Sequence, residues 1–308
     1  MDKPLIDEAA EVEYTPSGWP CPDHVGWTPA EILQEYLSAC KSGADKAYSC
    51  FSDQLTTIRY GERVYEEIDV IAPASTSGSC SLFALFHGGY WQEGHFRANS
   101  MHLAHPVIAA GHYFAGIGYL DIEQLTLDDI ITQAVDAVNQ LAEYASDHQI
   151  SSIVLSGHSA GAHLVVMLAI DNRLNPKARQ LIKGMALLSG VFDVTNLLKT
   201  SINIPKLALG DSLSAQRVSP LYRLPVDPIL FLHPPSILIA YGQVESPSFR
   251  NESINLHKLL EKLGMTSILF VCPEKDHFTS YTDAQNPSDS LATELVAMLN
   301  SLTLSSTN

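Results

Sequence analysis

The nine residues LSGHSAGAH (155–163) constrain the fold of this chain more than any other stretch. They contain the pattern G-x-S-x-G as Gly157, Ser159 and Gly161. The apolar run SSIVL comes before them and the helical run AHLVVMLAI follows, so the serine falls between a strand and a helix. A serine at such a junction occupies a strained turn that lifts its hydroxyl above the carboxyl edge of a parallel sheet. We therefore predict an α/β fold with Ser159 as nucleophile, the alternative being a small-residue turn that only packs.

Short apolar runs alternate with amphipathic ones on both sides of this junction. The runs typical of strands are residues 64–71, 81–86, 112–119, 151–157, 184–190, 236–242 and 267–272. Helices are predicted over 128–148 and near 249–263, where apolar residues recur with helical spacing and Gly264 offers a stop. Several strands are apolar throughout, as expected when both faces of a parallel sheet are covered. The pattern predicts a mostly parallel, doubly wound sheet with helices on both faces.

The ends of the pattern suggest its organisation. Residues 1–60 are predicted to be a mostly helical lead-in that packs on a catalytic domain of residues 61–308. The best helix in the lead-in is TPAEILQEYLSACKSG, where Thr28 and Glu31 can form a capping box. Residues 193–235 contain several prolines and are too long for a simple connection, so we interpret them as a segment that could cover the carboxyl edge of the sheet.

Charge and cysteine usage exclude some classes of function. The formal net charge is −16 without a basic cluster, which argues against binding to nucleic acid or to an anionic membrane surface. The five cysteines are widely spaced with no C-x-x-C pair, as expected for reduced thiols. The start MDKPLIDEAAEVEY lacks the apolar core of a signal peptide, and no long uncharged apolar stretch follows. We therefore expect a soluble cytoplasmic protein.

A serine hydroxyl needs a general base before it can act as a nucleophile. The strand–turn–helix pattern resembles that of α/β-hydrolases, in which the acid follows the serine along the chain and the histidine comes last. The residues PEKDHFTSY follow the last predicted strand, and His277 is the one histidine beyond that strand. We predict that His277 is the base, the alternative being a surface histidine.

The acid that would orient His277 has three candidates. Glu245 follows the strand SILIAYG, where its carboxylate could accept a hydrogen bond from Nδ1 of the histidine and stabilise the imidazolium. Asp193, after LLSGVF, is the second, because some hydrolases place the acid one strand earlier. Asp276 is ranked third, because it is adjacent to His277 in the sequence and the side chains of adjacent residues rarely reach each other well. We predict Glu245.

The stretch HGGY (87–90) follows an early predicted strand and carries two bare glycines. Attack by the serine creates an oxyanion that needs N–H donors fixed in advance, and lipases and esterases supply them from an H-G-G-G motif at this point. We predict that the backbone N–H groups of Gly88, Gly89 or Tyr90, with that of Ala160, form the oxyanion hole. A tight turn that merely packs is the alternative.

These motifs resemble kynurenine formamidase (arylformamidase), a serine-hydrolase family of the esterase and lipase type of α/β-hydrolase. The resemblance covers most of residues 60–300 and rests on HGGYWQ (87–92), GHSAGAH (157–163), SGVFD (189–193), SPLY (219–222), GQVESP (242–247) and DHF (276–278). The family's nucleophile falls on Ser159, its base on His277 and its acid, usually aspartate, on Glu245. Residues 116–124 lack the Asp-Tyr and the later Pro of relatives.

The resemblance implies hydrolysis of N-formyl-L-kynurenine to L-kynurenine and formate, a step of tryptophan catabolism, without cofactor or metal. Tyr90 and Trp91 would wall a small acyl pocket. A carboxylesterase acting on short-chain acyl esters would use the same triad, and a non-catalytic binding protein could use the same scaffold. The expected partner is a small arylformamide or ester, with no nucleic acid or membrane, and a homodimer is left open.

The stretch HLAHP (102–106) raises metal-dependent hydrolysis as a weaker alternative. Its two histidines stand at i and i+3, but no carboxylate motif accompanies them. We interpret them as packing or surface residues.

Overall fold

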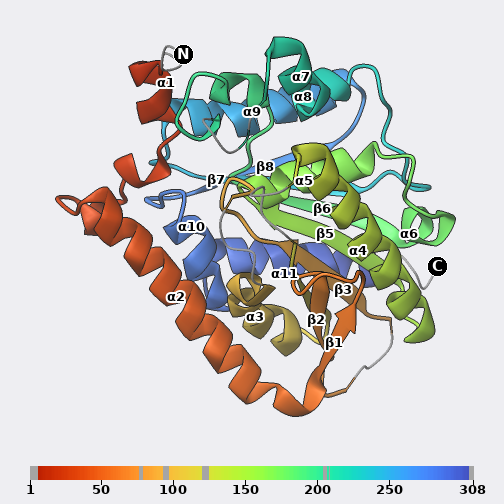
Figure 1. Cartoon of the computed structure of the whole chain (residues 1–308). Coiled ribbons are helices and arrows are strands. Elements are labelled where there is room, and N and C mark those ends of the chain that lie inside the picture. Colours follow the sequence, from red (N-terminus) through yellow and green to blue (C-terminus); the bar gives the residue numbers. More distant parts are fainter. Residues whose placement is uncertain are drawn as a thin grey trace.

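The computed structural model describes residues 6–75, 79–92, 97–119, 125–203, 207 and 209–304. Within these residues, eight strands form one sheet in the order β1-β2-β4-β3-β5-β6-β7-β8 (Figure 1). The strands are Leu55–Arg59 (β1), Glu67–Ile71 (β2), Ser81–Phe86 (β3), Tyr113–Ile117 (β4), Ser152–His158 (β5), Ile182–Leu188 (β6), Ser236–Gly242 (β7) and Ser267–Cys272 (β8). β2 runs antiparallel to β1 and β4, and the other neighbouring strands are parallel. The predicted mostly parallel sheet is confirmed.

Both faces of the sheet are buried because successive side chains of a strand enter opposite cores. In β3, Leu82, Ala84 and Phe86 belong to one buried apolar cluster, whereas Phe83 and Leu85 belong to a second one. The central strands therefore need apolar residues at every position.

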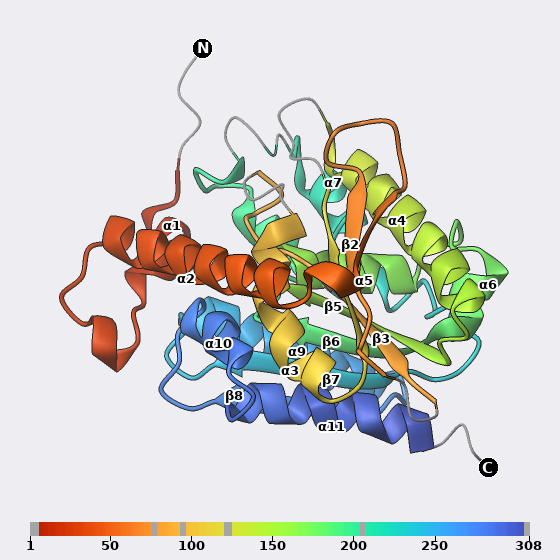
Figure 2. The ribbon, with the colours of Figure 1, turned by 90° about the horizontal axis from the view of Figure 1, so that it is seen from below.

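Helices cover each of these two cores (Figure 2). α4 (Leu127–Asp147), α5 (Ala160–Ala169) and α9 (Pro247–Lys262) contribute to the first core, and α2 (Pro29–Cys50), α3 (Ala104–Ala109) and α11 (Ser290–Leu304) to the second. The shorter helices are α1 (Glu8–Glu13), α6 (Pro176–Leu181), α7 (Ser212–Arg217), α8 (Pro220–Arg223) and α10 (Thr279–Thr282), with 3₁₀ turns η1 (Pro16–Gly18), η2 (Pro22–His24), η3 (Ser52–Gln54), η4 (Arg97–Leu103), η5 (Val194–Leu197) and η7 (Asp283–Gln285). None of the described helices is long and apolar enough to cross a membrane.

The N-terminal segment, defined here as residues 8–50, comprises α1, η1, η2 and α2. α2 lies along one side of the molecule and leads into β1 (Figure 1). The predicted capping box is present, because Thr28 and Glu31 each bond the backbone N–H of the other. α2 continues past Gly43, where a Cβ would lie 2.4 Å from Cβ of His102. This glycine is a packing contact with η4 and does not end the helix.

The structure also differs from the predicted elements. β1 was not predicted, since LTTIR is largely polar, as expected for a half-exposed edge strand. It joins the sheet although it falls within the predicted lead-in of residues 1–60. β7 and β8 have the predicted bounds. Residues 120–124 of the stretch 116–124, and 204–206 and 208 of the segment 193–235, lie outside the described residues.

Candidate active site

Ser159 lies at the turn between β5 and α5, as the G-x-S-x-G motif predicts. Its backbone has φ 54° and ψ −118°, a conformation that non-glycine residues rarely adopt. The flanking glycines make the turn possible, because a Cβ on Gly157 would lie 2.1 Å from the carbonyl carbon of Gly161. A Cβ on Gly161 would lie 2.2 Å from the carbonyl oxygen of Phe86 on β3. The turn is therefore packed too closely for any larger residue at either position.

His277 lies in the loop after β8 and meets Glu245, which follows β7. The distance from Nδ1 of His277 to Oε2 of Glu245 is 3.2 Å, and both residues are buried. Oε1 of Glu245 accepts a hydrogen bond from Ser189 Oγ at 2.5 Å and another from the N–H of Gly242 at 2.6 Å. Because these donors hold Oε1, the carboxylate presents Oε2 to the imidazole.

The two other candidate acids have different contacts. Asp193 Oδ1 accepts hydrogen bonds from the N–H and hydroxyl of Thr195 at the start of η5. Asp276 accepts bonds from the backbone of Phe278 and Thr279 and from the N–H of Cys21. Among the described contacts, neither carboxylate bonds the imidazole of His277. Each carboxylate instead accepts hydrogen bonds from residues that follow it closely in the chain and so stabilises its own turn.

The turn after β3 brings its glycines against the serine. A Cβ on Gly88 would lie 2.9 Å from Nδ1 of His158 and 3.1 Å from Cβ of Ser159, so no side chain fits. Gly89 has φ +115°, and Tyr90 has φ 49°. In the described part of the chain, the backbone N–H groups of Gly88, Gly89, Tyr90 and Ala160 have no hydrogen-bond acceptor. These groups are the ones predicted to form the oxyanion hole.

The side chains of Tyr90 and Trp91 lie in different environments. Tyr90 lines a cavity beside Ser159, and its hydroxyl donates to the carbonyl oxygen of Tyr14 at 2.7 Å. Trp91 is fully buried, and its indole packs edge-on against His163 with ring centroids 4.8 Å apart. It is not among the described residues that line the cavity, contrary to the predicted acyl-pocket wall. The indole packs in the core, where burial of its large apolar surface is most favourable.

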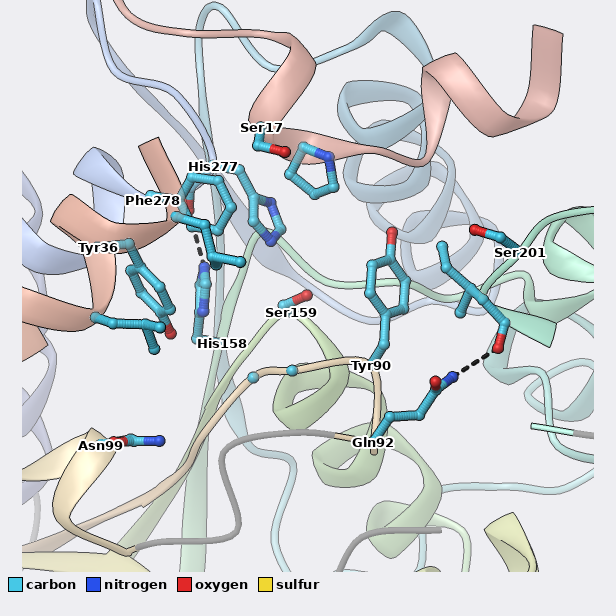
Figure 3. A pocket seen from close by; sticks show the side chains of 16 residues that line it. Ser17, Tyr36, Tyr90, Gln92, Asn99, His158, Ser159, Ser201, His277 and Phe278 are labelled. Carbon is cyan, nitrogen blue, oxygen red and sulfur yellow. Dashed lines mark hydrogen bonds between the residues drawn. The ribbon is translucent and has the colours of Figure 1, made fainter. Parts of the chain in front are cut away.

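The cavity beside Ser159 has a volume of about 310 Å³. It is lined by Pro16, Ser17, Leu33, Tyr36, Leu37, Gly88, Gly89, Tyr90, Gln92, Asn99, His158, Ser159, Ser201, Ile202, His277 and Phe278. Figure 3 shows Ser159 and His277 facing the same space, with Tyr36 and Phe278 on one side and Tyr90 and Gln92 on the other. None of these lining residues is Asp, Glu, Lys or Arg, so the described wall carries no fixed charge.

The sequence did not indicate that residues of the N-terminal segment line this cavity. Pro16 and Ser17 come from η1, and Leu33, Tyr36 and Leu37 from α2. Helical periodicity would have marked Leu33, Tyr36 and Leu37 as one face of α2, at i, i+3 and i+4. Periodicity does not say what that face packs against, because the contact is tertiary.

His158 is a further site residue that the sequence did not single out. Its ring stacks on Tyr281 with centroids 4.2 Å apart, and its Nε2 lies 2.9 Å from the carbonyl oxygen of His277. Burial, with the nearby His277, holds the pKa of His158 well below its usual value. A neutral imidazole that donates from Nε2 therefore helps to fix the backbone of His277.

Tyr119 supports the glycine turn from behind. Its hydroxyl donates to the carbonyl oxygen of His87 at 2.9 Å, and its ring stacks on the His87 imidazole with centroids 4.1 Å apart.

The two histidines of HLAHP do not line the cavity in the described part of the chain. His102 is buried with Nε2 3.4 Å from the carbonyl oxygen of Tyr281, and His105 packs against Phe51. Burial lowers the pKa of His102 to about 4, as expected for a packed neutral imidazole.

A mostly parallel sheet with helices on both faces and a serine at the β5–α5 turn defines an α/β-hydrolase. The family model BD-FAE matches residues 68–260. A kynurenine formamidase of Danio rerio is 32% identical over 282 residues, covering 90% of this chain and 91% of its own. One of Salmo salar is 30% identical over 279 residues, covering 90% of each chain. This chain therefore belongs to the kynurenine formamidase family of α/β-hydrolases, within the esterases that BD-FAE describes.

Solved structures of other hydrolases have the same fold. A protein of Silicibacter sp. TM1040, provisionally assigned as a thioesterase, superposes with a TM-score of 0.72 at 25% identity, covering 91% of this chain and 97% of that one. An esterase of the bacterial hormone-sensitive lipase family has a TM-score of 0.63 at 19% identity, covering 88% and 97%, and shares the fold.

Proposed function

We propose that this chain is a serine hydrolase that cleaves the formamide of N-formyl-L-kynurenine, releasing L-kynurenine and formate. The observation that carries the proposal is that one cavity contains both the strained Ser159 and a histidine bonded to the buried Glu245. Membership of the kynurenine formamidase family supports the substrate class. We also propose a cytoplasmic location, because the pattern of cysteines is that of reduced thiols.

In the proposed mechanism, Glu245 holds His277 as the tautomer with its proton on Nδ1. The bare Nε2 takes the proton of Ser159 as Oγ attacks the formyl carbon. The resulting oxyanion would receive hydrogen bonds from the N–H of Ala160 and from those of the 88–90 turn.

The proton on Nε2 then passes to the leaving nitrogen, and the arylamine departs while the formyl group stays on Ser159 as an ester. Water attacks this ester and gives its proton to Nε2. Collapse of the second oxyanion releases formate and returns the proton to Ser159.

The cavity walls fit the two ends of an arylformamide. A formyl group needs little space, and the 88–90 turn and Ser159 border the same cavity. The aromatic side chains of Tyr36 and Phe278 offer an apolar wall to an aryl ring. Ser17 and the amide oxygen of Gln92 are neutral polar groups that could bond the amino-acid end, since the Gln92 NH₂ group already donates to Ile202 and the Ser201 hydroxyl to Glu11.

A carboxylesterase acting on short acyl esters is the second candidate. The observation that favours it is the absence of Asp, Glu, Lys and Arg from the described lining, since a zwitterionic substrate would gain from a charged partner. The triad alone does not distinguish an ester from a formamide.

Steady-state kinetics would test the choice between them. Purified protein without added metal should release formate from N-formyl-L-kynurenine and keep this activity in EDTA. Its kcat/KM should exceed that for phenyl acetate and p-nitrophenyl butyrate. A preference for the esters by a wide margin would support the carboxylesterase.

A further inference from the structure

A second group of reactive side chains lies beside the loop that carries His277. Cys21, His24 and Asp276 place a sulfur, an imidazole nitrogen and a carboxylate oxygen within 4.8 Å of one another. Cys21 and Asp276 are almost fully buried. Cys21 immediately precedes η2 and His24 ends it, both in the N-terminal segment, whereas Asp276 immediately precedes His277. No step of the proposed hydrolysis uses Cys21 or His24.

The polar atoms of this group retain bonding capacity. Nδ1 of His24 is buried, has no hydrogen-bond partner among the described residues, and lies 3.9 Å from Oδ2 of Asp276, beyond hydrogen-bonding range. Oδ1 of Asp276 accepts from the N–H of Phe278 and from the N–H and hydroxyl of Thr279, whereas Oδ2, within the described part of the chain, accepts only from the N–H of Cys21 at 2.8 Å. A carboxylate oxygen has two acceptor positions, so Oδ2 has one to spare.

We propose that Cys21, His24 and Asp276 form a binding site for a zinc-like divalent cation. Thiolate, imidazole and carboxylate are the ligands that Zn²⁺ takes, and Cys21 and His24 have the short spacing of a metal-binding turn. In a tetrahedral zinc site such ligand atoms lie roughly 3.4–3.5 Å apart. The present separations, all within 4.8 Å, need only a small closing movement. A cation there would also bridge the unsatisfied Nδ1 of His24 to Oδ2.

A cavity beside the group offers room for a further ligand. Its volume is about 280 Å³, and Cys21, His24 and Glu35 are among its lining residues. Water or the Glu35 carboxylate could complete the coordination. The stacking of His24 on Trp27, with centroids 4.2 Å apart, already orients the imidazole. The bound cation would clamp the N-terminal segment onto the loop that carries His277.

Metal titration of the full-length protein tests the site. EDTA-treated protein should bind one equivalent of Zn²⁺ by calorimetry, and one equivalent of Co²⁺ should give a thiolate charge-transfer band. Zn²⁺ should also raise the melting temperature, because a ligand that binds only the folded state stabilises it. Cys21→Ser should remove the band and weaken binding at least about tenfold, and His24→Gln should weaken it similarly, as loss of a ligand predicts.

The matched control is Cys50→Ser, which removes an exposed thiol on α2. This variant should bind both metals as the parent does. Absence of stoichiometric binding in the parent, or a charge-transfer band that survives Cys21→Ser, would overturn the site. Both measurements are independent of hydrolysis, so they separate a failure of this site from a failure of the proposed function.

Discussion

The carboxyl ends of the central strands and the N-terminal segment border the same cavity but are held in different ways. Ser159, Glu245 and His277 follow β5, β7 and β8, where parallel pairing within one sheet fixes the backbone. The N-terminal segment packs apolar residues of α2 on the second core, and the stretch before α2 is also tied to the rest of the molecule by separate polar contacts. These include Tyr14 with Glu252, Glu13 with Ser246 and Ser248, and Cys21 with Asp276.

This difference suggests that the two regions have separate roles, catalysis and substrate selection. The strand ends would perform the chemistry, which requires atoms fixed to fractions of an ångström. The N-terminal segment would supply the wall that selects the substrate, and a wall can change without disturbing the reacting atoms. Variants of the first region should therefore lower kcat, and variants of the second should mainly change KM.

The largest effect is expected at Ser159. Ser159→Ala should lower kcat on the order of 10⁴- to 10⁶-fold and abolish labelling by a fluorophosphonate, because no other oxygen replaces the nucleophile. Ser156→Ala is a matched control on the same strand, since Ser156 Oγ bonds the carbonyl oxygen of Ala186 within the sheet. It should be labelled like the parent. Full labelling of Ser159→Ala would remove this serine from the mechanism.

Glu245→Gln should have the next largest effect, a loss in kcat of roughly 10²- to 10⁴-fold. The donors Ser189 and Gly242 would hold the amide oxygen at the position of Oε1, which turns the NH₂ group toward His277. Nδ1 would then have to accept, so Nε2 would carry the proton and could not take one from the serine. Glu245→Asp should keep partial activity, because it retains the charge.

Asp193→Asn is the control for the position of the acid. The Asp193 carboxylate caps η5 and does not bond the histidine in the described contacts, so kcat should stay within a fewfold of the parent. A larger loss at Asp193 than at Glu245 would show that the acid is misassigned.

The wall can be tested at Leu37, which lines the cavity from α2 and is 48% exposed. Leu37→Ala should raise KM for the arylformamide roughly three- to tenfold and leave kcat within about twofold, because it removes binding surface and no reacting group. Lys41→Ala, one turn further along α2 and outside the described lining, should change neither constant. A fall in kcat with unchanged KM would contradict the assignment of these separate roles to the two regions.

The two regions also differ in how far the sequence predicted them. The strand ends could be predicted because G-x-S-x-G, HGGY and the position of His277 each follow an apolar run whose strand is local in sequence. The wall could not, because it depends on tertiary contacts such as that between Tyr36 and Phe278, which lie far apart in the sequence. Trp91 shows that a motif can predict the course of the backbone without predicting a side chain. The stretch HGGYW indicated the turn after β3, but the sequence did not show that the indole packs against His163.

The remaining prediction concerns stability and Glu252, whose carboxylate holds the N-terminal segment from α9. Oε2 accepts from the N–H groups of Phe192 and Asp193, each at 2.8 Å, and Oε1 accepts from the hydroxyl of Tyr14. Complete burial nevertheless raises the pKa of Glu252 to about 7, with these donors opposing the shift. Glu252→Gln should therefore fold, since a neutral side chain is close to the state that burial favours.

The raised pKa of Glu252 has a definite consequence for stability. Because the folded state holds this proton more tightly than the unfolded chain, whose carboxyl has a pKa near 4.5, the stabilisation is complete below about pH 4.5 and is lost as the pH rises to about 7. The loss should be on the order of 1–3 kcal/mol in the free energy of unfolding. Glu252→Gln should lack this slope in urea unfolding over about pH 5 to 8, whereas Glu62→Gln, at an exposed position, should keep it. If both variants followed the parent curve, Glu252 would be ionised throughout this range, and the N-terminal segment would be held by a charge that the three donors fully stabilise.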